Sequence, residues 1–149
     1  MSLEPSPPES PADAVVNRHL RAGWWGLAVF VALGAVLELL HAIKSPVYVD
    51  AGRETTRLML RLAHAHGTLL AVLNVVYALT IRARPTHTAG ALASAALLAA
   101  LVLLPGGFLL GGLWARGGDP GLGVLLVPVG AALLLVGAIS VGRRVSIRE

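Results

Sequence analysis

The chain has 149 residues, of which 56% are hydrophobic and only 13% are charged, and its net charge is +4. Soluble domains carry about 25% charged residues, so this composition argues against that class and favours a membrane protein. The basic residues stand at the ends of apolar runs rather than in one patch, which argues against nucleic-acid binding. Cysteine is absent, which excludes disulfides, thiolate metal sites and covalent haem attachment through cysteine.

In chain order, residues 1–16 are rich in proline and acidic side chains and predict a disordered tail. Its acidic character is unlike the basic start of a signal peptide, so we expect the first apolar run to remain as a membrane span. That run covers about residues 22–43, with Trp24 and Trp25 at its start, and it ends before Ser45-Pro46.

Three further apolar runs predict spans over about residues 62–82, 89–114 and 122–141. Pro105 predicts a kink in the third span and Pro128 an interruption of the fourth. Gly107 and Gly111 form a GxxxG pattern, which permits close approach of two helices. Residues 17–149 are therefore expected to form a single all-α domain, an integral membrane bundle of four transmembrane helices with short loops.

The basic residues at the span ends indicate the orientation. Seven lie on the side that holds both termini and five on the other, which places both termini in the cytoplasm by the positive-inside rule. Lys44 is the only lysine, and this arginine preference together with the abundant alanine, glycine, leucine and valine suggests a bacterial inner-membrane protein.

Ionisable residues inside the spans are the main functional signal, because polar groups at membrane depth are costly unless they have a partner. Glu38 and His41 share one stripe of the first helix, with Gly34 one turn before Glu38. His64 and His66 lie near the start of the second span. At 1.5 Å per residue, all four lie within about 9 Å of the non-cytoplasmic surface and are expected to share one layer.

Helical phase separates the two neighbouring histidines. A seam of small residues on the second span predicts its contact face, and its members are Ala63, Gly67, Ala71, Asn74 and Ala78. His64 lies about 60° from the seam and His66 about 100° on the other side, so the two cannot face the same partner. We expect His64 to point inward, and Asn74 is the polar intramembrane residue most directly in the seam.

Several chemistries suit these residues. Glu38, His41 and His64 match a site for iron or zinc with two imidazoles and one carboxylate. A b-type haem between His41 and His64 or His66 is an alternative, as is a proton relay through Glu38 and His41. The structural alternative is that Glu38 pairs with Arg61 or His64 and holds the first two spans together.

These alternatives give three functional hypotheses: a metal- or haem-binding redox or metal-handling subunit, a non-catalytic structural or assembly subunit, and a small proton or ion pathway. The partners expected are the lipid bilayer and, for assembly, a second copy or a larger membrane complex. Hydrolase motifs are absent, which argues against that class of enzyme.

Four residues or groups outside the spans carry further expectations. His19 and His87 are predicted to be solvated, and Asp50 to cap the second long helix. Arg53, Arg57 and Arg61 form a stripe that suits lipid headgroup contact or, alternatively, an anion-attracting rim.

Overall fold

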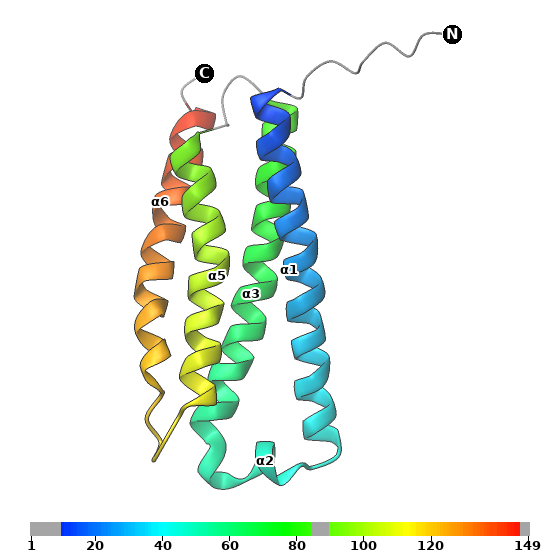
Figure 1. The fold of residues 1–149 in the computed structure, drawn as a ribbon, viewed down its shortest axis with the longest axis vertical. Coiled ribbons are helices and arrows are strands. Elements are labelled where there is room, and N and C mark those ends of the chain that lie inside the picture. Colours follow the sequence, from blue (N-terminus) through cyan, green and yellow to red (C-terminus); the bar gives the residue numbers. More distant parts are fainter. Residues whose placement is uncertain (1–9, 85–89, 147–149) are drawn as a thin grey trace, which may run out of the picture.

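The computed structural model describes residues 10–84 and 90–146, which contain four long helices and no β-strand (Figure 1). The long helices are α1 (Pro11–Ala42), α3 (Glu54–Ala83), α5 (Ala91–Leu113) and α6 (Leu126–Ser146). Short turns α2 (Pro46–Val49) and η1 (Ala51–Arg53) join α1 to α3, and η2 (Leu122–Leu125) leads into α6. All four long helices are long and apolar enough to cross a membrane, as the sequence predicted.

Helix α1 begins earlier than predicted. Ser10 caps its N-terminus by accepting a hydrogen bond from the Asp13 backbone N–H, and Pro11 occupies the first turn, where its missing N–H is harmless. Residues 11–16, which we had expected in the disordered tail, are therefore helical. The remaining tail residues 1–9 lie outside the described part of the chain.

Helix α1 ends in a Schellman motif. Lys44 adopts a left-handed backbone with φ of 51°, its N–H bonds the His41 carbonyl at 3.0 Å, and the Ser45 N–H bonds the Leu40 carbonyl at 3.0 Å. Pro46 then prevents the helix from continuing. The predicted end of the first long helix before Ser45-Pro46 is thus confirmed.

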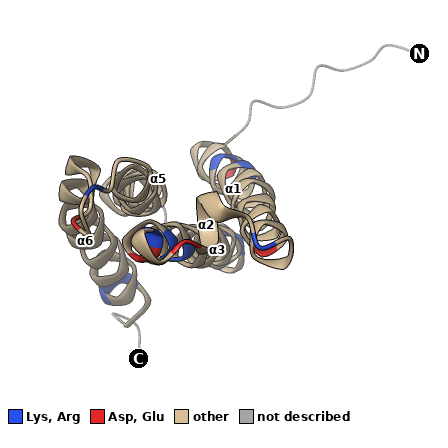
Figure 2. Ribbon diagram, turned by 90° about the horizontal axis from the view of Figure 1, so that it is seen from below, with Lys and Arg blue, Asp and Glu red and all other residues tan. Residues whose placement is uncertain are grey.

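The four helices pack in chain order, so α1 packs chiefly on α3, α3 on α5, and α5 on α6 (Figures 1 and 2). Small residues allow the α1–α3 contact: the Phe30 ring of α1 lies directly on Gly67 of α3. The predicted seam on α3 is confirmed, because all five of its members are buried.

Glycines bring α5 and α6 together as well. A Cβ on Gly107 would lie 2.9 Å from the Val127 backbone nitrogen, and one on Gly130 would lie 2.6 Å from that of Leu104. The GxxxG pattern of α5 is therefore used within the chain. Pro105 is buried inside a continuous α5. Pro128 lies in the first turn of α6, where proline is tolerated, so the predicted interruption of the fourth helix by Pro128 does not occur within α6.

Candidate functional site

Glu38 lies exposed on the outer side of α1. Within residues 10–84 and 90–146 it has neither a hydrogen bond nor an ion pair, so the predicted pairing with Arg61 or His64 is not formed. A carboxylate in this position would face lipid if the helix spans a membrane, which is unfavourable without a partner. Glu38 is thus a charged side chain for which the described part of the chain supplies no hydrogen bond or ion pair.

His41 lies exposed in the last turn of the same helix. Its ring contacts Tyr48 of α2 edge to face, with 6.4 Å between ring centroids. Tyr48 is buried, and it receives a 3.2 Å hydrogen bond on its hydroxyl from the Arg61 guanidinium. His41 therefore packs on the turn that closes the α1–α3 hairpin.

His64 fills the α1–α3 interface, as its helical phase predicted. Its imidazole lies directly over Gly34, and its Nδ1 is 2.7 Å from the Phe30 carbonyl oxygen. Because a carbonyl only accepts, Nδ1 carries the proton and donates. In the neutral ring, Nε2 then keeps its lone pair.

His66 faces the opposite neighbour. Its ring lies 4.9 Å from that of Phe108 on α5, and its Nδ1 donates to the Leu62 carbonyl oxygen at 2.9 Å. The prediction that the two histidines face different partners is confirmed. The expectation that only His64 points inward is not, since both are half-buried between helices.

The four predicted residues therefore have four different environments. Across the described residues, no group of three or more His, Asp or Glu side chains is arranged to hold one metal ion. Roles for Glu38, His41, His64 and His66 as ligands of a metal or of haem remain predictions. If these residues hold a metal ion, further ligands must come from outside the described part of this chain.

A fully buried polar site lies elsewhere, near the end of the bundle at which α1 begins and α3 ends. His19 of α1, Asn74 of α3 and Ser94 of α5 are all buried. His19 Nδ1 lies 2.6 Å from Asn74 Oδ1, and His19 Nε2 lies 2.8 Å from Ser94 Oγ. One imidazole thus joins three helices; we call this group the His19 triad.

Hydrogen bonding within the His19 triad is complete. An amide oxygen only accepts, so His19 Nδ1 donates to Asn74 and, in the neutral ring, Nε2 accepts from the Ser94 hydroxyl. The Asn74 amide donates to the Leu70 carbonyl at 2.8 Å, and the Tyr77 ring packs on the imidazole edge to face with centroids 4.7 Å apart. Each buried side-chain polar atom in the described part of the chain has a partner.

The expectation that His19 is solvated was wrong. Extending the α1 contact face by one turn before Gly23 leads to His19, and this helical signal was available in the sequence. It was missed because the span was predicted to begin at residue 22, three residues after the histidine. His87, the other residue with this expectation, lies outside the described residues.

Arginines fasten the α1–α3 connection. Arg57 donates to the backbone carbonyls of Tyr48 and Asp50, at 2.9 and 2.7 Å, and lies 4.0 Å from Glu54. Asp50 acts through its carbonyl and its side chain caps no helix, contrary to prediction. Arg57 and Arg61 therefore hold the α2 turn, in addition to any contact with lipid headgroups.

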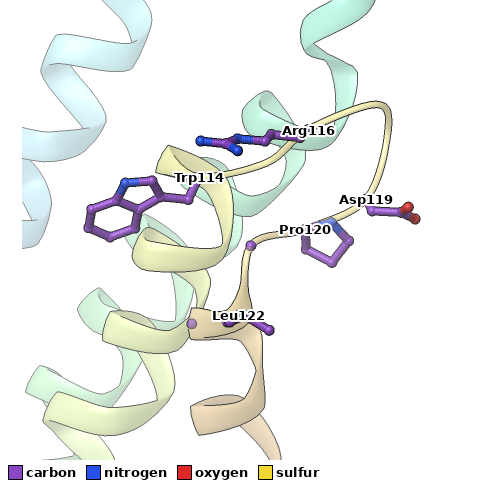
Figure 3. Close-up of a pocket in the computed structure, with 7 residues that line it drawn as sticks. Trp114, Arg116, Asp119, Pro120 and Leu122 are labelled. Carbon is purple, nitrogen blue, oxygen red and sulfur yellow. The ribbon is translucent and has the colours of Figure 1, made fainter.

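A surface pocket of 480 Å³ lies at the α5–α6 connection. Arg116 and Asp119 exchange two backbone hydrogen bonds of 3.0 Å there, across a turn in which Gly117 and Gly118 have positive φ. Figure 3 shows that the Arg116 and Asp119 side chains point in different directions, while Trp114 lies along the outside of α5. The pocket thus lacks a group of converging polar side chains.

Comparisons with protein-family models, with curated proteins and with solved structures found no match to this chain.

Proposed function

We propose that this protein is a multi-pass membrane protein of the bacterial inner membrane, with both termini cytoplasmic, that acts as a non-catalytic subunit of a membrane assembly. The single observation that carries this proposal is Glu38, a carboxylate on the outer side of an apolar helix that has no partner among residues 10–84 and 90–146. Burying it against another helix would remove it from lipid and give it a hydrogen-bond donor.

The surroundings of Glu38 suit a helix–helix contact. Glu38 belongs to a row of exposed residues on α1 that are spaced alternately four and three apart, the pattern that keeps one face toward a neighbouring helix. Half of them are alanine, which allows close approach. We call this set the outer face of α1; its members are Trp24, Ala28, Val31, Ala35, Glu38 and Ala42.

The other small-residue faces are already occupied within the chain. The α3 seam packs on α1, and the glycines of α5 pack on α6. By contrast, only 11% of the most apolar stretch is buried in each outer helix, α1 and α6, against 50% in α5. An external helix therefore has room on the outer helices, and of these two α1 carries the exposed carboxylate while α6 has no acidic residue.

Cysteine cross-linking tests this proposal cleanly, because the chain has no native cysteine. We expect Ala35→Cys to give a cross-linked adduct in native membranes, whereas Ala131→Cys, exposed on α6, gives none. In the Ala35→Cys variant, the additional change Glu38→Leu should abolish the adduct. The additional change Lys44→Gln, which removes a charge at the same end of α1, should not. A monomeric wild-type protein, together with an Ala35→Cys variant that forms no adduct, would overturn the assembly role.

Labelling tests the location and the orientation. The chain should remain in the membrane pellet after alkaline extraction. A membrane-impermeant thiol reagent should label Gly52→Cys from the outside and Ser146→Cys only after the membrane is opened; Gly52 has open space for the added side chain. The reverse labelling pattern would contradict the orientation.

Metal or haem binding is a second candidate function, favoured by the position of the ring proton on two histidines. His64 and His66 both direct Nδ1–H at backbone carbonyls, an arrangement common in metal-ligating histidines because it leaves Nε2 free. Metal analysis and a visible spectrum of protein purified from native membranes test it. Metal or haem should be lost in His64→Ala and retained in Ser140→Ala; a metal-free, colourless preparation would overturn this function.

A further inference from the structure

An apolar groove runs between α3 and α6, in the half of the molecule near the two termini. Because α3 and α6 both pack on α5 and make little contact with each other, they leave a gap of 300 Å³ that is floored by α5. The residues that form it include Val76, Tyr77, Leu97, Leu134, Ala138 and Gly142.

The walls of the groove suit a hydrocarbon chain. Hydroxyl groups come only from Tyr77 and Thr80, and the Thr80 hydroxyl donates to the Val76 carbonyl of its own helix at 2.8 Å. The groove therefore offers apolar contact with little polar surface to desolvate.

A second pocket continues the groove toward the end of α3. It shares Val76 and Thr80 with the first, has a volume of 420 Å³, and is lined by Arg84 at its far side. The apolar track thus ends at a cationic side chain.

The length of this track matches one leaflet of a bilayer. Leu73 and Arg84 mark its two ends on α3. At 1.5 Å per residue they lie about 16 Å apart along the helix, and half of the hydrocarbon thickness is about 15 Å. A helix of a partner protein, about 10 Å wide, is a poorer fit to a gap of 300 Å³.

We propose that this groove is a binding site for one anionic phospholipid. An acyl chain lies between α3 and α6, and the phosphate lies at the level of Arg84, as in basic sites between helices on the cytoplasmic side of membranes. The inference rests on the membrane location proposed above, and it does not depend on the assembly through α1.

Native mass spectrometry of the full chain, released from mild detergent micelles, tests the site. The probes are dioleoyl phosphatidylglycerol and dioleoyl phosphatidylcholine, which share acyl chains and differ in charge. We expect one phosphatidylglycerol to bind at concentrations several-fold lower than phosphatidylcholine. Arg84→Gln should reduce this preference about fivefold, the effect of one arginine near a membrane surface.

A substitution that fills the groove tests the acyl-chain site more directly. Gly142 lines the groove, and a Cβ added there meets no atom within 4 Å, so Gly142→Leu should occupy the acyl site without disturbing the fold. It should abolish the single tight adduct. Gly106→Leu is the matched control, since Gly106 also has open space but lies on α5 outside the groove.

The outcomes separate this site from the proposed function. Adducts that are unchanged in Gly142→Leu, or that ignore headgroup charge, would overturn the lipid site. A protein dimer that is lost in Gly142→Leu would show that a second copy occupies the groove, which also overturns it. Release of the chain by alkaline extraction, or absence of the Ala35→Cys cross-link, would instead count against the proposed location or assembly, whatever the lipid result.

Discussion

The two ends of the α1–α3 interface treat polar side chains in opposite ways. Near the termini, His19 is fully buried and both of its ring nitrogens have partners on two other helices. Near the α2 turn, Glu38 is exposed and, within the described residues, has no partner. A polar group that a chain satisfies by itself supports folding, whereas one that it leaves unsatisfied at membrane depth points outside the chain.

The largest effect is expected from the His19 triad. Asn74→Leu leaves His19 Nδ1 buried without a partner, so the free energy of unfolding should fall by about 1–3 kcal/mol. Unfolding by sodium dodecyl sulfate in mixed micelles measures this. Ser140→Ala, which removes only a hydroxyl bonded to its own helix, serves as the control and should have little effect. Equal stability of the two variants would deny the triad its structural role.

The next effect concerns the close approach of His64 and Gly34. Gly34→Ala places a methyl group against the imidazole, which must move, and the expected loss of stability is about 1–3 kcal/mol. His64→Ala makes space for that methyl group, so the double variant should lose less than the sum of the two single changes. Strict additivity in this double-mutant cycle would show that the two residues are not in contact.

A small effect on the single chain is expected from Glu38→Leu. The carboxylate makes no contact within the described residues that the change could remove, so the unfolding free energy of the monomer should change by less than about 0.5 kcal/mol. The same variant should dissociate the assembly. A large loss of monomer stability would mean that the chain itself satisfies Glu38, and the contrast with His19 would disappear.

The most local effect is expected at the α2 turn. Arg61→Met removes a 3.2 Å hydrogen bond to the Tyr48 hydroxyl but keeps most of the aliphatic stem. Global stability should fall by about 0.5–1.5 kcal/mol at most. Hydrogen exchange of backbone amides in residues 45–53 should rise several-fold. Unchanged exchange there would show that Arg57 alone holds the turn.

The sequence predicted the helices better than the contacts between them. Long apolar runs and the breaks at Ser45-Pro46 are local signals, and so is the small-residue seam that places Asn74 at a helix interface. The His19 triad was not predicted, because it forms only where three helices distant in sequence meet. The early start of α1 was missed although Ser10, Pro11 and Asp13 together form a helix-start signal.

The predicted Glu/His layer shows the same limit. Depth in the membrane follows from counting residues, but side-chain direction depends on which neighbours a helix acquires. His66 contacts α5, a helix whose position relative to α3 could not be derived from phase alone. Four residues at similar depth therefore ended in separate environments.

Packing in chain order has a consequence for how this protein is made. Each long helix packs chiefly on the long helices next to it in the chain, so contacts between helices join consecutive segments. Such low contact order favours rapid folding, and synthesis delivers the N-terminal helices first. The α1–α3 hairpin can therefore close while the ribosome is still producing α5, and α6 adds last, completing the lipid groove only when the chain is nearly finished.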